Sequence, residues 1–146
     1  MQMPNSGLAV DGACSGNPGP SKYRGVDIYT GDIVFSSQIG YATNNICEFV
    51  ALCHAIGYAM QNGHTQIYCD SVTAMAWLKD KKVNSKLVVH EKTKKAHELV
   101  RRSLEFLKTV EVEHDGIDLV INDSIAVSKW HTAEWGEISA DYGNKK

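Results

Sequence analysis

This 146-residue sequence lacks the long apolar runs that mark membrane proteins. No apolar run approaches the ~20 residues that span a bilayer. The first residues, MQMPNSG, contain neither a basic region nor an apolar stretch, so we expect no secretory signal. We therefore expect a cytoplasmic protein with no membrane partner.

Paired cysteines are also missing. Cys14, Cys47, Cys53 and Cys69 form no CxxC pair and have no metal-like spacing with histidine. Structural zinc sites usually take ligands in closely spaced pairs, so a zinc cluster is the weaker interpretation. Free thiols, buried or half-buried in a reducing compartment, are favoured.

A strong overall charge is absent too, because the formal net charge is only −2. Its distribution is uneven. Residues 79–102 hold nine of the fifteen basic side chains against three acids, whereas residues 105–123 hold six acids and one lysine. A local basic face attracts phosphates more than the total charge suggests. The alternative for such a run is an ordinary solvated helix surface.

What the sequence does contain is typical of one compact domain. Hydrophobic residues make up 43%, charged residues 22% and aromatic residues 8%, which are ordinary globular values. We find no repeats, low-complexity tracts or linkers. We therefore expect a single domain over residues 1–146, and a monomer.

The apolar patterns predict alternating strands and helices. Thr43 or Asn44 is a plausible cap for the first helix. Strands are expected at 7–13, 22–30, 33–41, 65–69 and within 117–130, and helices at 47–63, 71–78, 91–108 and in the last dozen residues. Three hairpin-linked strands followed by crossover helices imply a mixed five-stranded sheet, antiparallel at first and then parallel, flanked by helices.

Four carboxylates stand in distinctive sequence frames. They are Asp11 in LAVDGACSGNPGP, Glu48 in ATNNICEFVAL, Asp70 in QIYCDSVTAMAW and Asp141 in WGEISADYGNK. Each alone has an ordinary explanation: a hairpin loop, a helix-dipole partner, a helix cap and a solvated acid. Asp11 and Asp70, however, lie at the ends of expected strands, where ligands gather in such sheets. Converging acids repel one another, so they need a positive group, and divalent metal ions are the simplest candidates.

Taken together, these frames resemble type 1 ribonuclease H, in particular a bacterial branch ending in WGEI-x-ADYG-x-K. The resemblance runs from about Leu8 to Lys146 and is carried by DGACSGNPGP, TNN-x-x-E, CDSVTA, DKK-x-x-S-x-L and KWHTAEWGEISADYGNK. It implies an α/β ribonuclease H-like fold. It also implies a metal-dependent endonuclease that hydrolyses the RNA strand of RNA–DNA hybrids and leaves 5′-phosphate and 3′-hydroxyl ends.

The resemblance further implies a site with two Mg²⁺ ions, for which Mn²⁺ can substitute. Asp11 would bridge both ions, Glu48 and Asp70 would bind one, and Asp141 would bind the other. Glu137 matches a position that assists product release. His131 is a less favoured occupant of that role, because the WGEI match fixes the register.

The resemblance implies hybrid contacts as well. Asn17, Asn44 and Asn45 would touch the minor groove, and Thr43, Asn45, Ser85 and Thr132 would hold a DNA phosphate. Val72 replaces a hydrogen-bonding glutamine of close relatives, which should weaken one contact. The stretch 111–124 is longer and more acidic than expected before the last strand.

Two alternatives remain open from the sequence. One is a nuclease of the same fold with another substrate, such as a 3′ exonuclease or a junction resolvase. The other is a catalytically weak hybrid-binding module. The GNPG and TNN elements argue against the first, and the presence of all four acids argues against the second.

Overall fold

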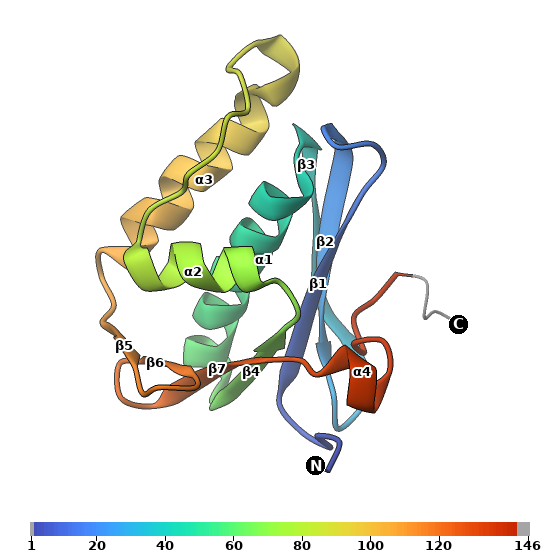
Figure 1. The fold of residues 1–146 in the computed structure, drawn as a ribbon, viewed down its shortest axis with the longest axis vertical. Helices are drawn as coiled ribbons and strands as arrows, with labels where there is room; N and C mark the ends of the chain where they lie inside the picture. The colour runs from blue at the N-terminus through green and yellow to red at the C-terminus, as the bar shows by residue number, and fades with distance from the viewer. Residues whose placement is uncertain (1, 143–146) are drawn as a thin grey trace.

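Residues 2–142 are described by a computed structural model, in which a seven-stranded sheet runs in the order β3-β2-β1-β4-β7-β6-β5 (Figure 1). The strands are β1 (Leu8–Cys14), β2 (Gly19–Asp27), β3 (Ile33–Ala42), β4 (Gln66–Cys69), β5 (Val112–His114), β6 (Leu119–Ile121) and β7 (Ile125–Lys129). The helices are α1 (Asn44–Asn62), α2 (Val72–Asp80), α3 (Lys94–Leu107) and α4 (Thr132–Trp135), with a 3-10 turn η1 (Glu91–Thr93) before α3. The predicted mixed α/β architecture is confirmed.

The prediction of five strands was wrong, because the acidic stretch 111–124 forms two further strands. Asn122 and Asp123 both adopt positive φ, at 51° and 59°, in the turn 122–124, where the amide of Ser124 donates to the carbonyl of Ile121. Such a turn matches the natural twist of a hairpin and folds β6 back onto β7. β5 then pairs with β6 and ends the sheet. The sequence pattern counted the apolar run of β6 together with that of β7 as one strand, and β5 gave too weak a periodicity to be predicted.

The register of the central strands decides where the acids lie. β1 and β4 are parallel, and their last paired residues are Val10 and Cys69. Asp11 and Asp70 are the next residues of the chain after this pair, so the two acids lie side by side where the pairing of β1 with β4 ends. Asp11 lies inside β1 rather than at its end, because β1 continues to Cys14 in its antiparallel pairing with β2.

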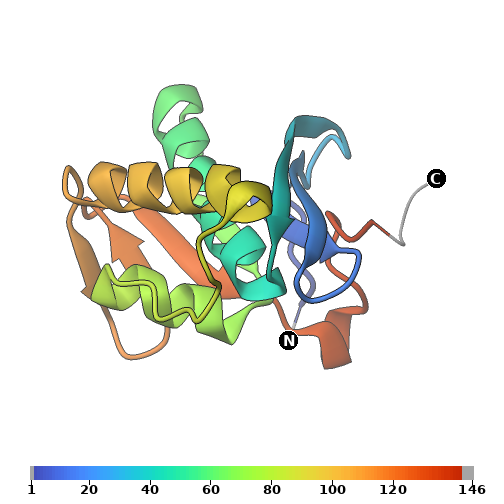
Figure 2. The ribbon, with the colours of Figure 1, turned by 90° about the horizontal axis from the view of Figure 1, so that it is seen from above.

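Helices α1, α2 and α3 lie on one side of the sheet and α4 lies on the other (Figure 2). The larger core joins α1 to β1 and β4 and includes the fully buried Phe49 and Leu52. A smaller core on the opposite face joins Ala9 and Val26 to Trp130 of the chain after β7. The second core attaches the C-terminal part of the chain to the sheet.

The described part of the last dozen residues differs from its prediction of a helix, and the remainder of that prediction, at 143–146, lies outside the described residues. α4 spans only Thr132–Trp135, and residues 136–142 contain no helix. Ile138 and Ala140 of this segment are fully buried in the smaller core. Apolar burial, rather than a helix, therefore holds the segment that carries Asp141.

None of the helices within residues 2–142 combines the length and the apolar character needed to cross a membrane.

The β5–β6 hairpin can be tested as part of the core by a matched pair of isoleucines. Ile121 is fully buried, whereas Ile117 in the hairpin loop is 85% exposed. We expect Ile121→Ala to lower the free energy of unfolding by about 2–5 kcal/mol, because it leaves a cavity. Ile117→Ala should change it by no more than about 0.5 kcal/mol. Equal effects in chemical denaturation would contradict the seven-stranded arrangement.

Candidate active site

Three of the four predicted acids converge. Asp11, Glu48 and Asp70 each offer a carboxylate oxygen, and these oxygens all lie within 4.8 Å of one another. Asp11 and Glu48 are buried and Asp70 is half-buried. They come from β1, from the second turn of α1 and from the residue after β4, so the fold brings together segments that are far apart in sequence.

Glu48 reaches Asp11 because α1 begins close to β1. Thr43 caps α1, and its side chain accepts a hydrogen bond from the amide of Ile46. Glu48 lies one turn further along, where its Oε2 accepts a hydrogen bond from the amide of Gly12 at 3.3 Å. The cap therefore sets the rotation of the helix that directs Glu48 toward the sheet.

A glycine and a buried thiol permit this close approach. A Cβ atom at Gly12 would lie 2.9 Å from Sγ of Cys47, which is too close for real contacts. Burial raises the pKa of the Cys47 thiol to about 12, so the thiol is neutral. Cys14, Cys47, Cys53 and Cys69 are all free, which confirms the prediction of free thiols.

The cluster is electrostatically unfavourable by itself. Burial is the main cause that raises the pKa of Asp11, and the Asp70 charge adds to it. The pKa of Glu48 is raised more strongly, first by burial and then by the neighbouring Asp11 carboxyl. Oε1 of Glu48 is buried without a hydrogen-bond partner. This buried oxygen therefore lacks the cation or hydrogen-bond donor that a buried carboxylate needs.

Asp141 lies at the edge of the cluster rather than inside it. Beyond the larger effect of burial, its charge also raises the pKa of both Asp11 and Asp70. Arg24 of β2 donates to the carbonyl of Asp141 from Nη2 at 2.7 Å and to the carbonyl of Ala140 from Nε at 2.8 Å. The backbone of Asp141 is therefore attached to the strand beside Asp11.

The donor set fits a divalent metal ion of the Mg²⁺ type. Its ligand atoms are carboxylate oxygens, which hard cations prefer. A cation between the acids would relieve their repulsion and give the orphaned Oε1 of Glu48 a partner. Asp11, Glu48 and Asp70 could hold such an ion, with Asp141 beside them.

The residues predicted to contact a hybrid fall into two groups. Asn17 joins the start of α1, because its Oδ1 accepts a hydrogen bond from the amide of Asn44 at 2.9 Å. Asn17, Asn44 and Asn45 are exposed beside the cap residue Thr43. These four residues therefore form one polar surface next to Glu48.

Ser85 and Thr132 lie elsewhere. The Ser85 hydroxyl accepts a hydrogen bond from the amide of Leu87 in the segment between α2 and η1. Thr132 begins α4, on the other side of the sheet. No hydrogen bond between described residues links either of them to Thr43 or Asn45. Glu137 is exposed in the segment after α4.

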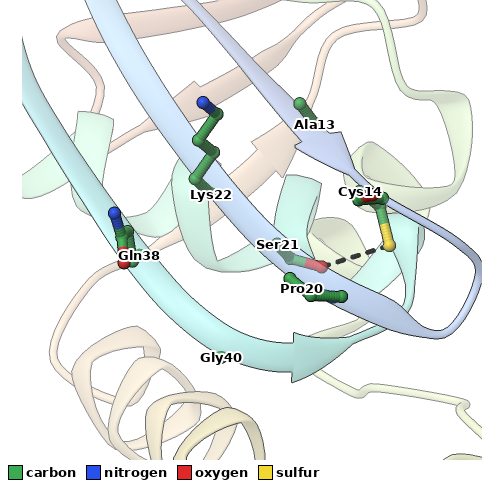
Figure 3. A pocket seen from close by; sticks show the side chains of 8 residues that line it. Ala13, Cys14, Pro20, Ser21, Lys22, Gln38 and Gly40 are labelled. Carbon is green, nitrogen blue, oxygen red and sulfur yellow. Dashed lines mark hydrogen bonds between the residues drawn. The ribbon is translucent and has the colours of Figure 1, made fainter.

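A hollow of about 400 Å³ opens beyond Asp11, along β1 and β2 (Figure 3). The Ser21 hydroxyl donates to Sγ of Cys14 at 3.1 Å in its wall. Lys22 and Gln38 also line it, and its lining contains no carboxylate. It is therefore chemically distinct from the acidic cluster.

Two cations near the cluster were not identified from the sequence. Lys129 pairs with Cys69 across β4 and β7, and it opposes the effect of burial on the pKa of Asp70. Arg24 is paired with Asp11 across β1 and β2. Both positions follow from strand register: that of Arg24 depends on the β1–β2 hairpin, and that of Lys129 on the parallel pairing of β4 and β7, which no local sequence signal gives.

Comparison with known proteins places this geometry in a family. Residues 5–118 match the family described as RNase H, and the chain belongs to that family. The matched residues include Asp11, Glu48 and Asp70 and end before Thr132, Glu137 and Asp141.

Curated relatives share part of the chain. Ribonuclease H of Cyanothece sp. is 41% identical over an alignment of 76 residues, covering 49% of this chain and 48% of that protein. Ribonuclease H of Neorickettsia sennetsu is 36% identical over 89 residues, covering 53% of this chain and 59% of that protein. The chain thus spans about half the length of the curated relatives it matches.

A solved structure of LC11-RNase H1 in complex with an RNA/DNA hybrid aligns with a TM-score of 0.51 at 18% identity. The alignment covers 87% of this chain and 86% of that one. At this identity the likeness supports a common fold.

The raised pKa of Glu48 predicts a pH-dependent gain in stability when the charge is removed. Because the pKa of Glu48 is higher in the folded state than in the unfolded state, where it is about 4, the protonated Glu48 favours folding at low pH. This contribution to stability is complete below about pH 4 and is lost as the pH rises toward the folded-state pKa. Without divalent ions, Glu48→Gln should therefore raise the melting temperature at about pH 8 and have little effect near pH 4.

Glu113→Gln provides the control, because Glu113 is exposed on β5. Thermal unfolding in EDTA measures both variants. A Glu48→Gln variant that gains no more at high pH than Glu113→Gln would contradict the electrostatic description of the cluster.

Proposed function

We propose that this chain is a divalent-metal-dependent endoribonuclease that cuts the RNA strand of RNA–DNA hybrids. The observation that carries the proposal is the group of three carboxylates, Asp11, Glu48 and Asp70, in a chain of the RNase H family. Their mutual repulsion and the orphaned oxygen of Glu48 call for a cation. Relatives named ribonuclease H support the choice of reaction.

The four acids would hold two Mg²⁺ ions, with Mn²⁺ as a substitute. We assign Asp11 to both ions, Glu48 and Asp70 to one and Asp141 to the other. Bound there, the ions would supply Lewis-acid activation of a water and stabilisation of the departing 3′ oxygen, giving 5′-phosphate and 3′-hydroxyl ends. The amide of Gly12 orients the Glu48 carboxylate through the hydrogen bond to Oε2.

Exposed side chains supply the charges and donors that a hybrid needs. Asn17, Asn44 and Asn45 are exposed next to Glu48 and would reach sugar hydroxyls and base edges. The nine basic residues of 79–102 are all exposed, along α2, the following segment and α3: Lys79, Lys81, Lys82, Lys86, Lys92, Lys94, Lys95, Arg101 and Arg102. These basic side chains would attract the phosphate backbones.

Several finer assignments stay predictions from the sequence. Thr43, Asn45, Ser85 and Thr132 are proposed to hold a DNA phosphate, and Glu137 to assist product release. Three broader expectations also stay predictions: a monomeric state, one domain over residues 1–146, and a cytoplasmic location.

The main test is cleavage of a labelled hybrid beside matched duplex RNA, duplex DNA and single strands, with Mg²⁺ or EDTA. We expect cleavage of the RNA strand of the hybrid alone, and only with the metal. Asp70→Asn should abolish turnover, because a neutral amide binds Mg²⁺ weakly, and it should leave hybrid binding measurable.

Asp123→Asn is the matched control for that variant, since Asp123 is exposed in the turn between β6 and β7. It should cleave at the wild-type rate. If the wild-type chain at micromolar concentration cleaves no hybrid, the proposed function is wrong. Normal cleavage by Asp70→Asn would show that the metal-ligand assignment is wrong.

A further test addresses Glu137. If this exposed acid assists product release, Glu137→Ala should slow steady-state turnover more than it slows a single first cut, which burst kinetics separate. Glu134→Ala, at an exposed position of α4, should change neither rate. Equal slowing of the burst and of turnover would show that Glu137 does not assist product release.

A further inference from the structure

Arg24 occupies an unusual place beside the acidic cluster. In the antiparallel pairing of β1 and β2 it lies directly opposite Asp11. Residues paired in this way project their side chains to the same face of the sheet. A permanent positive charge thus stands next to the central acid of the site.

The guanidinium is nevertheless used for another contact. Nε donates to the carbonyl of Ala140 at 2.8 Å and Nη2 to the carbonyl of Asp141 at 2.7 Å. The ring of Tyr142 covers it, with Cζ of Arg24 4.5 Å from the ring centroid. Among residues 2–142 Arg24 forms no ion pair, so Asp11 remains available to a metal ion.

The segment that Arg24 holds has few other attachments near Asp141. The indole of Trp130 donates to the carbonyl of Gly136 at 2.8 Å, and Ile138 and Ala140 are buried against the sheet. The amide of Asp141 donates to the carbonyl of Ile138 in a turn. No helix or strand includes residues 136–142, so secondary structure does not fix the position of the Asp141 carboxylate.

We propose that Arg24 is a positioning residue that fixes Asp141 beside Asp11 by clamping the carbonyls of residues 140 and 141. The inference rests on the proposed function, because it assigns Asp141 to the metal site. Arginine suits this role since its planar fork presents donors in fixed directions. Lysine has the same charge, but it cannot hold two carbonyls in a fixed geometry and is free to pair with Asp11.

The test compares three variants of the full chain. Arg24→Gln removes the charge and the fork, Arg24→Lys keeps only the charge, and Lys22→Gln removes another positive charge from the same face. Lys22 is the matched control, because its Nζ also lies over the Tyr142 ring, at 4.8 Å from the centroid. No hydrogen bond of the described residues joins the Lys22 side chain to residues 136–142.

We expect Arg24→Gln and Arg24→Lys to raise the Mg²⁺ concentration for half-maximal cleavage roughly tenfold or more, as loss of a group that orients a ligand does. The kcat value should fall and the KM for the hybrid should stay near its wild-type value. Lys22→Gln should leave the Mg²⁺ requirement unchanged. Equal effects of Arg24→Gln and Lys22→Gln would show that Arg24 acts only through its positive charge, and would overturn the proposal.

Two measurements do not depend on cleavage. Calorimetric titration with Mn²⁺ should show weaker binding to Arg24→Gln at temperatures well below its melting point. Amide exchange of residues 137–142 should be faster in this variant, while that of α1 stays the same. If Arg24→Gln does not fold, Tyr142→Leu should give the same changes to a smaller extent.

Unchanged metal binding with a lowered melting temperature would leave Arg24 a purely structural role and overturn the inference. A wild-type chain that binds Mn²⁺ at this cluster but cleaves no hybrid would instead contradict the proposed function.

Discussion

The parallel register of β1 and β4 is the constraint on which the site depends. Because the pairing of β1 with β4 stops at Val10 and Cys69, Asp11 and Asp70 lie side by side just beyond it. α1 must then lie close enough for Glu48 to join them, and the absence of a side chain at Gly12 permits this. A shift of one residue in this register would turn one of the acids to the opposite face.

The cationic side chains beside the cluster donate to backbone carbonyls, so they do not neutralise its carboxylates. Arg24 donates to backbone carbonyls, and Nζ of Lys129 donates to the carbonyl of Trp130 at 3.0 Å. Neither side chain forms an ion pair within the part of the chain that the structure describes. The carboxylates therefore retain their affinity for an external cation, at the cost of raised pKa values in its absence.

Sequence reasoning succeeded where a feature is local and failed where it depends on distant pairing. The cap at Thr43, the helix that follows and the free cysteines were all predictable from nearby residues. β5 was missed, because a three-residue strand barely alternates, and β6 was not counted apart from β7, because their pairing depends on the turn at Asn122 and Asp123. The same limit hid Arg24 and Lys129, whose positions are set by register. The roles of the acids came from the motif resemblance and stay a proposal.

The two outer strands of the sheet differ in a way that bears on association between molecules. β5 has only three residues, includes the exposed Glu113 and is flanked by the acids Glu111 and Asp115. β3 is ten residues long, but its pairing with β2 is interrupted by two register shifts. Short, charged or bulged edges are poor templates for a further strand. The acidic hairpin thus ends the sheet with an edge that discourages strand-to-strand aggregation.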